Sequence, residues 1–195
     1  TRLIPRDIPQ LATVRIPFHR VVCRGTCQPG PIKETEQDIT VAVEMAARQR
    51  QKAASVSELL PINLARGENN EFLVLDFGRE VTGHLRLQVS GAKAGQRVDI
   101  GYDETLDAQG LVNPRRTYVH FADRFYLRDN QEEISVFGPR GFRYLLIDVN
   151  SGLGGLAISG ASVDERTYPI RSHGMFRCSD ETLNQLYQVG LTTTR

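Results

Sequence analysis

Polar side chains that could do chemistry gather in one stretch of this chain, GYDETLDAQGLVNPRR, at residues 101–116. Asp103, Glu104 and Asp107 supply carboxylates, Asn113 supplies an amide and Arg115 supplies a guanidinium. Two carboxylates that face each other can act as general acid and general base. Polar groups beside an aromatic ring can instead hold the hydroxyls of a sugar. The stretch therefore admits either catalysis or ligand binding.

Catalysis is the weaker interpretation because of where the two adjacent carboxylates fall. Asp103 and Glu104 follow the predicted strand Val98 to Tyr102, and neighbouring residues on a strand point to opposite faces. They cannot face each other without a bulge, so we expect them to make turn and loop hydrogen bonds. We predict no catalytic residue in this chain. The candidate carbohydrate-binding residues are Asp103, Glu104, Asn113, Arg115 and Tyr118.

Metal chemistry has little support in the spacing of possible ligands. Asp103, Glu104, Asp107 and Asn113 could donate oxygens to Ca²⁺, but their spacing does not match an EF-hand loop. The CRGTC pair at residues 23 and 27 lacks a second Cys or His pair for zinc, so reduced thiols are expected. We predict no cofactor, with calcium as the alternative.

Composition and charge limit the possible partners. The 24 basic and 23 acidic residues leave a net charge of +1, so no global field favours nucleic acid or a membrane surface. No apolar stretch is long enough to cross a bilayer, and the first residues lack the layout of a signal peptide. We expect a soluble protein, cytoplasmic or secreted; cysteine usage does not decide between the two.

The elements that must position these residues centre on the stretch Phe72 to Val89, FLVLDFGREVTGHLRLQV. Leu85, Leu87 and Val89 alternate with polar residues, which is the period of a half-buried strand. Gly78 and Gly83 lie at the break between the two apolar runs, where we predict a turn or bulge.

Other short strands follow at intervals near ten residues, which is typical of a β-sandwich or jelly roll. They are predicted at residues 14–22, 39–45, 98–102, 118–127, 134–137, 141–149 and 156–163. A short helix is predicted at residues 46–60, and another helix begins after Ser179 and Asp180, which are N-cap residue types. We therefore predict an all-β antiparallel sandwich with a short helix in the N-terminal third and the start of a helix at the C-terminus.

Three parts are expected along the chain. Residues 1–70, rich in proline near the start, form a linker with accessory strands and a helix. Residues 71–168 form the β-sandwich, and residues 169–195 begin a helical domain. RGENN at residues 66–70 is the turn-rich break that sets the first boundary.

Four landmarks in this order resemble bacterial α-L-rhamnosidases of glycoside hydrolase family 78. They are LDFGREVTG at residues 75–83, YDETLDAQG at 102–110, GFRYLLI at 141–147 and GMFRCSDETLNQLY at 174–187. The resemblance implies a concanavalin-like β-sandwich that precedes an (α/α)6 catalytic barrel. In that family the barrel carries both catalytic carboxylates and cleaves terminal α-L-rhamnosides with inversion. The barrel would lie beyond Arg195.

The resemblance therefore implies a non-catalytic module that supports the catalytic domain of a rhamnosidase-like glycoside hydrolase. Its partners would be that downstream domain and, through the parent enzyme, rhamnosides. Two alternatives stay open. One is a carbohydrate-binding module for rhamnose or plant glycans, assisted by calcium, and the other is a protein-interaction domain whose Arg48 to Lys52 helix docks a partner.

Overall fold

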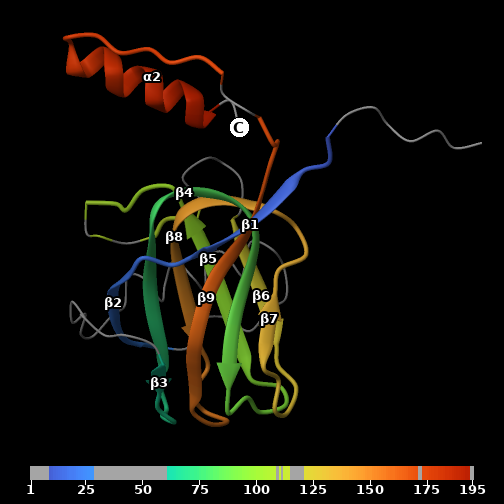
Figure 1. Cartoon of the computed structure of the whole chain (residues 1–195). Coiled ribbons are helices and arrows are strands. Elements are labelled where there is room, and N and C mark those ends of the chain that lie inside the picture. Colours follow the sequence, from blue (N-terminus) through green and yellow to red (C-terminus); the bar gives the residue numbers. More distant parts are fainter. Residues whose placement is uncertain are drawn as a thin grey trace, which may run out of the picture. The chain divides into compact units, whose positions relative to one another are not determined.

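A computed structural model of the chain describes residues 9–28, 61–108, 110, 112–114, 121–170 and 173–193. The chain divides into two compact units, residues 15–165 and residues 1–14 with 166–195. The first unit holds most of the strands, and the second holds the described helix (Figure 1).

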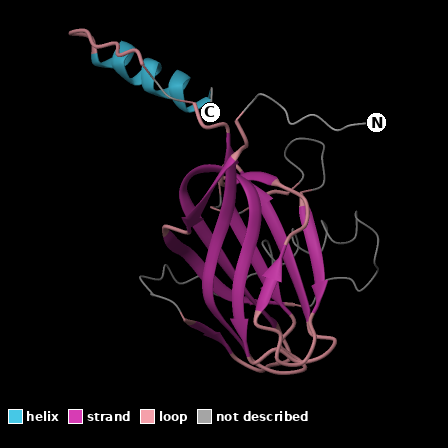
Figure 2. Ribbon diagram, turned by 45° about the vertical axis from the view of Figure 1, so that its right-hand side comes forward, coloured by secondary structure: helices cyan, strands magenta, loops and turns pink. Residues whose placement is uncertain are grey.

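Nine antiparallel strands and one helix make up the described structure (Figure 2). The strands are β1 (Ala12–Pro17), β2 (Arg20–Cys27), β3 (Ile62–Leu64), β4 (Asn70–Ser90), β5 (Arg97–Asp103), β6 (Ala122–Tyr126), β7 (Glu133–Ser135), β8 (Arg140–Val149) and β9 (Leu156–Thr167). The helix is α2 (Glu181–Thr193).

The long strand β4 belongs to both layers of the sandwich. Its first part, up to Asp76, lies between β2 and β8, and β8 continues the layer to β5 and β6. Its second part, from Gly83, pairs with β9, and from Arg86 also with β7. Its register against β8 shifts between Asp76 and Val81, at the bend. The predicted all-β antiparallel sandwich is thus confirmed.

Two glycines permit this bend, as the sequence predicts. Gly78 has a φ of 78°, which favours glycine over any residue with a side chain. At Gly83, a Cβ would overlap the backbone carbonyl of Asp164 on β9. β4 and β9 can therefore approach closely only because residue 83 has no side chain.

The main core fills the space between the two layers. Leu73 and Leu75 from the first part of β4 meet Leu85 and Leu87 from its second part in one buried cluster. Phe142 of β8 lies in the same cluster, fully buried, with its ring centroid 5.3 Å from that of Phe77. A second cluster is formed by Cys23, Cys27, Phe72, Val74, Val112, Ala122 and Leu146. Residues 72–77 of β4, residues 145–149 of β8 and all of β5 are therefore buried on both faces.

One strand prediction was wrong. Residues 14–22 are not one strand: β1 ends at Pro17 and β2 begins at Arg20. Between them, the Phe18 amide donates to the Ala161 carbonyl at 3.1 Å, and the His19 amide donates to the Asp76 carbonyl at 2.8 Å. The chain passes here from β9 in one layer to β4 in the other, and alternation along the sequence does not reveal such a crossing.

The other strand predictions that fall on described residues have counterparts in β4 to β9. The predicted start of a C-terminal helix is confirmed, because the Asp180 carboxylate accepts the Thr182 amide at 2.8 Å as an N-cap. The predicted strand at residues 39–45, the helix at 46–60 and its Arg48 to Lys52 segment lie outside the described residues.

The predicted division into three parts stays a prediction. β2 and β3 come from residues 1–70, which the sequence sets apart, yet they are hydrogen-bonded to β4 and β9. Across the described ranges, helices are too short or too polar to cross a membrane.

Candidate functional site

Strand β5 ends at Asp103, within the polar stretch of residues 101–116. The Asp103 side chain is buried, and its carboxylate accepts backbone N–H groups from Thr105 at 3.3 Å and Asn113 at 2.8 Å. A bridge between Leu106 and Val112 closes the same loop. Asp103 therefore holds the two ends of the loop together, which is the structural role expected from the sequence.

A small cavity brings three of the candidate residues to one place. Its volume is about 30 Å³, and it is lined by Tyr102, Asp103, Glu104, Asn113, Pro114, Phe121 and Gly141. This is room for about one water molecule and is far less than a sugar ring occupies. Arg115 and Tyr118 lie outside the described residues, so sugar binding by the full set stays a prediction.

An aromatic residue that lines the cavity belongs to the core. Tyr102 is 1% exposed, and its hydroxyl donates to the Asp123 carboxylate at 2.8 Å. Arg140 donates to the same carboxylate at 2.7 Å and 3.1 Å. Burial, and then the negative charge of Asp123, raise the pKa of Tyr102, so its hydroxyl stays protonated.

Metal ligands do not converge in the part of the chain that the structure describes. There, no group of three or more His, Cys, Asp or Glu side chains is placed to hold an ion. Cys23 and Cys27 are buried and form no disulfide. Calcium binding by the Asp103 loop therefore stays a prediction.

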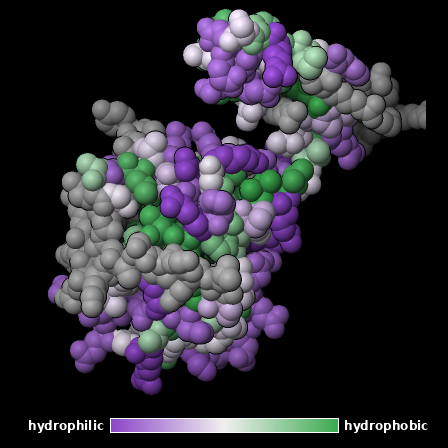
Figure 3. Space-filling model, turned by 60° about the vertical axis from the view of Figure 1, so that its left-hand side comes forward, coloured by the Kyte–Doolittle hydropathy of each residue, from purple (hydrophilic) through white to green (hydrophobic). Residues whose placement is uncertain are grey.

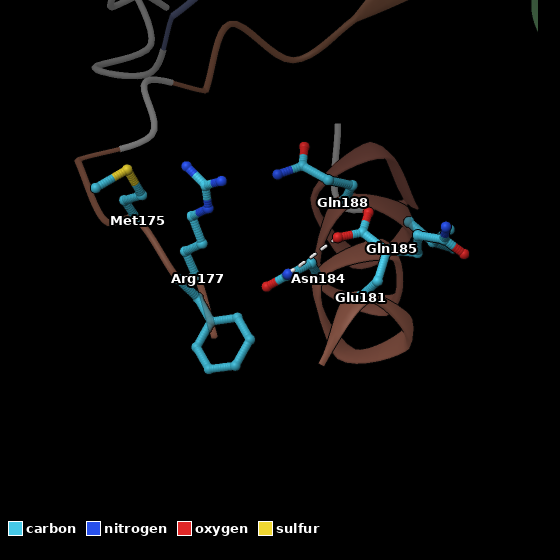
Figure 4. Close-up of a pocket in the computed structure, with 8 residues that line it drawn as sticks. Met175, Arg177, Glu181, Asn184, Gln185 and Gln188 are labelled. Atoms are coloured by element: carbon cyan, nitrogen blue, oxygen red, sulfur yellow. Dashed lines mark hydrogen bonds between the residues drawn. The ribbon is translucent and has the colours of Figure 1, made fainter. Parts of the chain in front are cut away.

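The larger opening lies in the second unit, between residues 175–177 and α2 (Figure 4). It has a volume of about 680 Å³ and is lined by Met175, Phe176, Arg177, Glu181, Asn184, Gln185, Gln188 and Val189. Asn184 donates to Glu181 at 3.3 Å and to the Cys178 carbonyl at 3.0 Å. Because Glu181 is the one acid among these lining residues, they do not supply the two carboxylates that glycoside hydrolysis needs.

Comparison with known proteins shows the family to which the β-sandwich belongs. Residues 66–162 match the family described as the bacterial α-L-rhamnosidase concanavalin-like domain. The chain contains a bacterial α-L-rhamnosidase concanavalin-like domain. No curated protein sequence matches the chain.

Two solved rhamnosidase structures resemble this chain. A glycoside hydrolase family 78 rhamnosidase of Bacillus sp. GL1 is 28% identical with a TM-score of 0.61, over 73% of this chain and 15% of that protein. A rhamnosidase from Klebsiella oxytoca with rhamnose bound shares the fold at 18% identity and a TM-score of 0.65, over 95% of this chain and 35% of that protein. The chain thus spans well under half the length of either structure.

The rhamnosidase domain also contains a buried polar cluster that the sequence reasoning missed. Asp148 of β8 accepts hydrogen bonds from Asn70 Nδ2 at 2.8 Å and from Cys27 Sγ at 3.4 Å. Asp99 of β5 accepts two bonds from Arg124, at 2.6 Å and 2.8 Å. The available signal was an aspartate inside an apolar run, in RVDIGYD and in YLLIDV.

Another buried carboxylate, Asp76 of β4, differs from Asp148 because arginines bind it. Asp76 is 1% exposed and is bound by Arg143 at 2.9 Å and Arg20 at 3.1 Å. Burial opposes its ionisation, but the hydrogen bonds from Arg143, the Gly78 amide and Arg20 hold its pKa below the ordinary value. This residue belongs to the LDFG landmark, where its role is to fix the bend of β4.

Proposed function

We propose that this concanavalin-like domain is a non-catalytic module that supports the catalytic domain of an α-L-rhamnosidase-like glycoside hydrolase. The observation that carries the proposal is the family match over residues 66–162. The similarity to the Bacillus rhamnosidase, of which this chain covers 15%, adds support. The parent enzyme would hydrolyse terminal α-L-rhamnosides with inversion, on carboxylates outside this domain.

The contacts of Asp103 support a structural role for the acidic loop. An inverting hydrolase needs a proton donor and a second carboxylate that activates water from the opposite side of the sugar. Asp103 is instead buried and bound by two backbone amides, whereas Glu104 is exposed. A carboxylate held in this way stabilises a loop and is poorly placed to exchange protons with a substrate.

An activity assay tests the proposal. The chain of residues 1–195 should release no phenol from an aryl α-L-rhamnoside above the buffer blank. The protein translated from the complete source reading frame should release rhamnose, with inversion visible in the NMR signal of the first anomer formed. Turnover by the 195-residue chain that is lost in Asp103→Asn or Glu104→Gln would contradict a non-catalytic role.

A second candidate function is sugar binding on the surface of the loop that brings Asp103, Glu104 and Asn113 together, outside the small cavity that these residues line. Calorimetric titration with rhamnose, with and without EDTA, separates this function from a purely supporting one. Heat of binding that depends on Asn113 would favour a carbohydrate-binding module. If millimolar rhamnose gives no heat of binding, only the supporting function remains.

A further inference from the structure

Two buried aspartates lie opposite each other on neighbouring strands with unequal partners. Asp99 of β5 and Asp148 of β8 are paired in the β5–β8 register, and their exposed fractions are 0% and 1%. Asp99 has its charge balanced by the bidentate Arg124 and by Arg97, whose Nε lies 3.4 Å from Asp99 Oδ2. The two arginines of this cluster are thus both directed at Asp99.

Among the described residues, the hydrogen-bond donors to Asp148 are both neutral. From β4 it receives the Asn70 amide and from β2 the Cys27 thiol, one donor to each carboxylate oxygen. From β5 it faces the negative charge of Asp99, and the positive charge of Arg97 acts on it without a hydrogen bond. An ionised carboxylate without a cation in contact is costly to bury.

The neighbours of Asp148 can also serve its protonated form. A carboxylic acid needs an acceptor for its own proton. Rotation of the Asn70 amide presents an oxygen in place of the nitrogen, so the same residue can bind either state. The site therefore suits a carboxyl group that holds a proton in the folded domain.

We propose that Asp148 is a buried proton-binding site that makes the stability of this domain depend on pH through the contact of β2, β4 and β8. Burial, together with the charge of Asp99, raises the pKa of Asp148 to about 7, against about 3.8 for a free side chain. Hydrogen bonds from Asn70 and Cys27 act in the opposite direction and do not offset this rise.

The sign of the effect follows from which state holds the proton. Between pH 4 and pH 7 the folded domain keeps the Asp148 proton and the unfolded chain has lost it. The contribution of Asp148 to the free energy of unfolding is therefore greatest below about pH 4. It falls as the pH rises to about 7 and is constant above that. Over the full interval the folding constant would change roughly 1,000-fold because of this residue.

The variant Asp148→Asn tests the proposal, because an asparagine can keep hydrogen bonds to Asn70 and Cys27 and does not titrate. Chemical unfolding of the 195-residue chain is measured from pH 5 to pH 8 for both proteins. The ratio of the variant's folding constant to that of the native protein should rise roughly 100-fold between pH 5 and pH 8, with most of the rise below pH 7. A ratio that stays constant within threefold overturns the proposal.

A matched control is Asp76→Asn, which alters an equally buried aspartate that has two arginine partners. Because the pKa of Asp76 is lowered, its stabilising effect is present at neutral pH and is lost on acidification. The variant should therefore lose most stability at neutral pH and approach the native protein in acid. A rise in relative stability like that expected for Asp148→Asn would overturn the assignment to Asp148.

A direct titration keeps the proposal testable if Asp148→Asn does not fold. The ¹³C chemical shift of the Asp148 carboxyl, followed in the native chain, should show a midpoint near pH 7. A midpoint below about pH 4.5, in the ordinary range of aspartate, would overturn the proposal.

Discussion

The two parts of β4 differ in how they are buried, although they form one continuous strand. Residues 72–77 are buried on both faces of the sheet. From Val81 to Val89, buried residues alternate with exposed or half-buried ones. In the first part, Phe72 and Val74 contact the second cluster while Leu73 and Leu75 contact the main core. In the second part, only one face contacts the core.

The ion pairs on the two layers differ in their exposure to solvent. Over the second part of β4, Asp164 of β9 binds Arg15 and Arg86, and Arg86 also binds Glu133. Those arginines are partly exposed, whereas Arg124 on the other layer is 3% exposed. On the face visible in Figure 3, hydrophobic side chains lie in several small groups among hydrophilic ones. The arginines around Asp164 thus reach solvent, whereas the ion pair of Arg124 with Asp99 is enclosed.

The largest expected effect tests the doubly buried part of β4. Phe72→Ala removes a fully buried ring from the second cluster and should reduce the free energy of unfolding by about 3–5 kcal/mol. His84→Ala, on the half-buried outer face of the second part, should cost less than about 0.5 kcal/mol. Denaturant unfolding measures both, and equal losses would mean that the two parts of β4 are buried alike.

The next effect tests the place where the two parts of β4 meet. Gly83→Ala should reduce the free energy of unfolding by about 1–3 kcal/mol, because the new methyl group overlaps the Asp164 carbonyl. Gly138→Ala is the matched control, since a Cβ there meets no atom within 4 Å. Thermal unfolding compares the two, and a stable Gly83→Ala protein would argue against the close approach of β4 and β9.

The smallest effect concerns the exposed ion pairs. A double-mutant cycle with Arg86→Ala and Asp164→Ala should give a coupling energy of about 0.2–1 kcal/mol, which added salt reduces. The hydrogen bonds from Arg15 and Arg86 lower the pKa of Asp164 to about 2. The coupling should therefore persist down to about pH 4 and disappear as the pH falls through 2. A coupling of several kcal/mol would mean that this ion pair is shielded from solvent, as the pair of Arg124 and Asp99 is.

The candidate site was only partly predictable from the sequence. The composition of residues 101–116 locates a loop rich in carboxylates, and three of its members do line one cavity. The alternation rule also anticipates that Asp103 and Glu104 differ in exposure. The buried cluster around Asp148 was not foreseen, because its members come from five strands: β2, β4, β5, β6 and β8.

The sequence by itself determined strands β4 to β9, the bend at Gly78 and Gly83, and the family of the domain. These properties depend on local period, on backbone freedom at glycine and on ordered landmarks, all of which are properties of short segments. Only the tertiary structure decided that residues 14–22 cross between layers. It also decided that, within the described ranges, Arg97 and Arg124 bind Asp99 while Asn70 and Cys27 bind Asp148. Strand pairing sets those contacts, and burial then determines which charge can be tolerated.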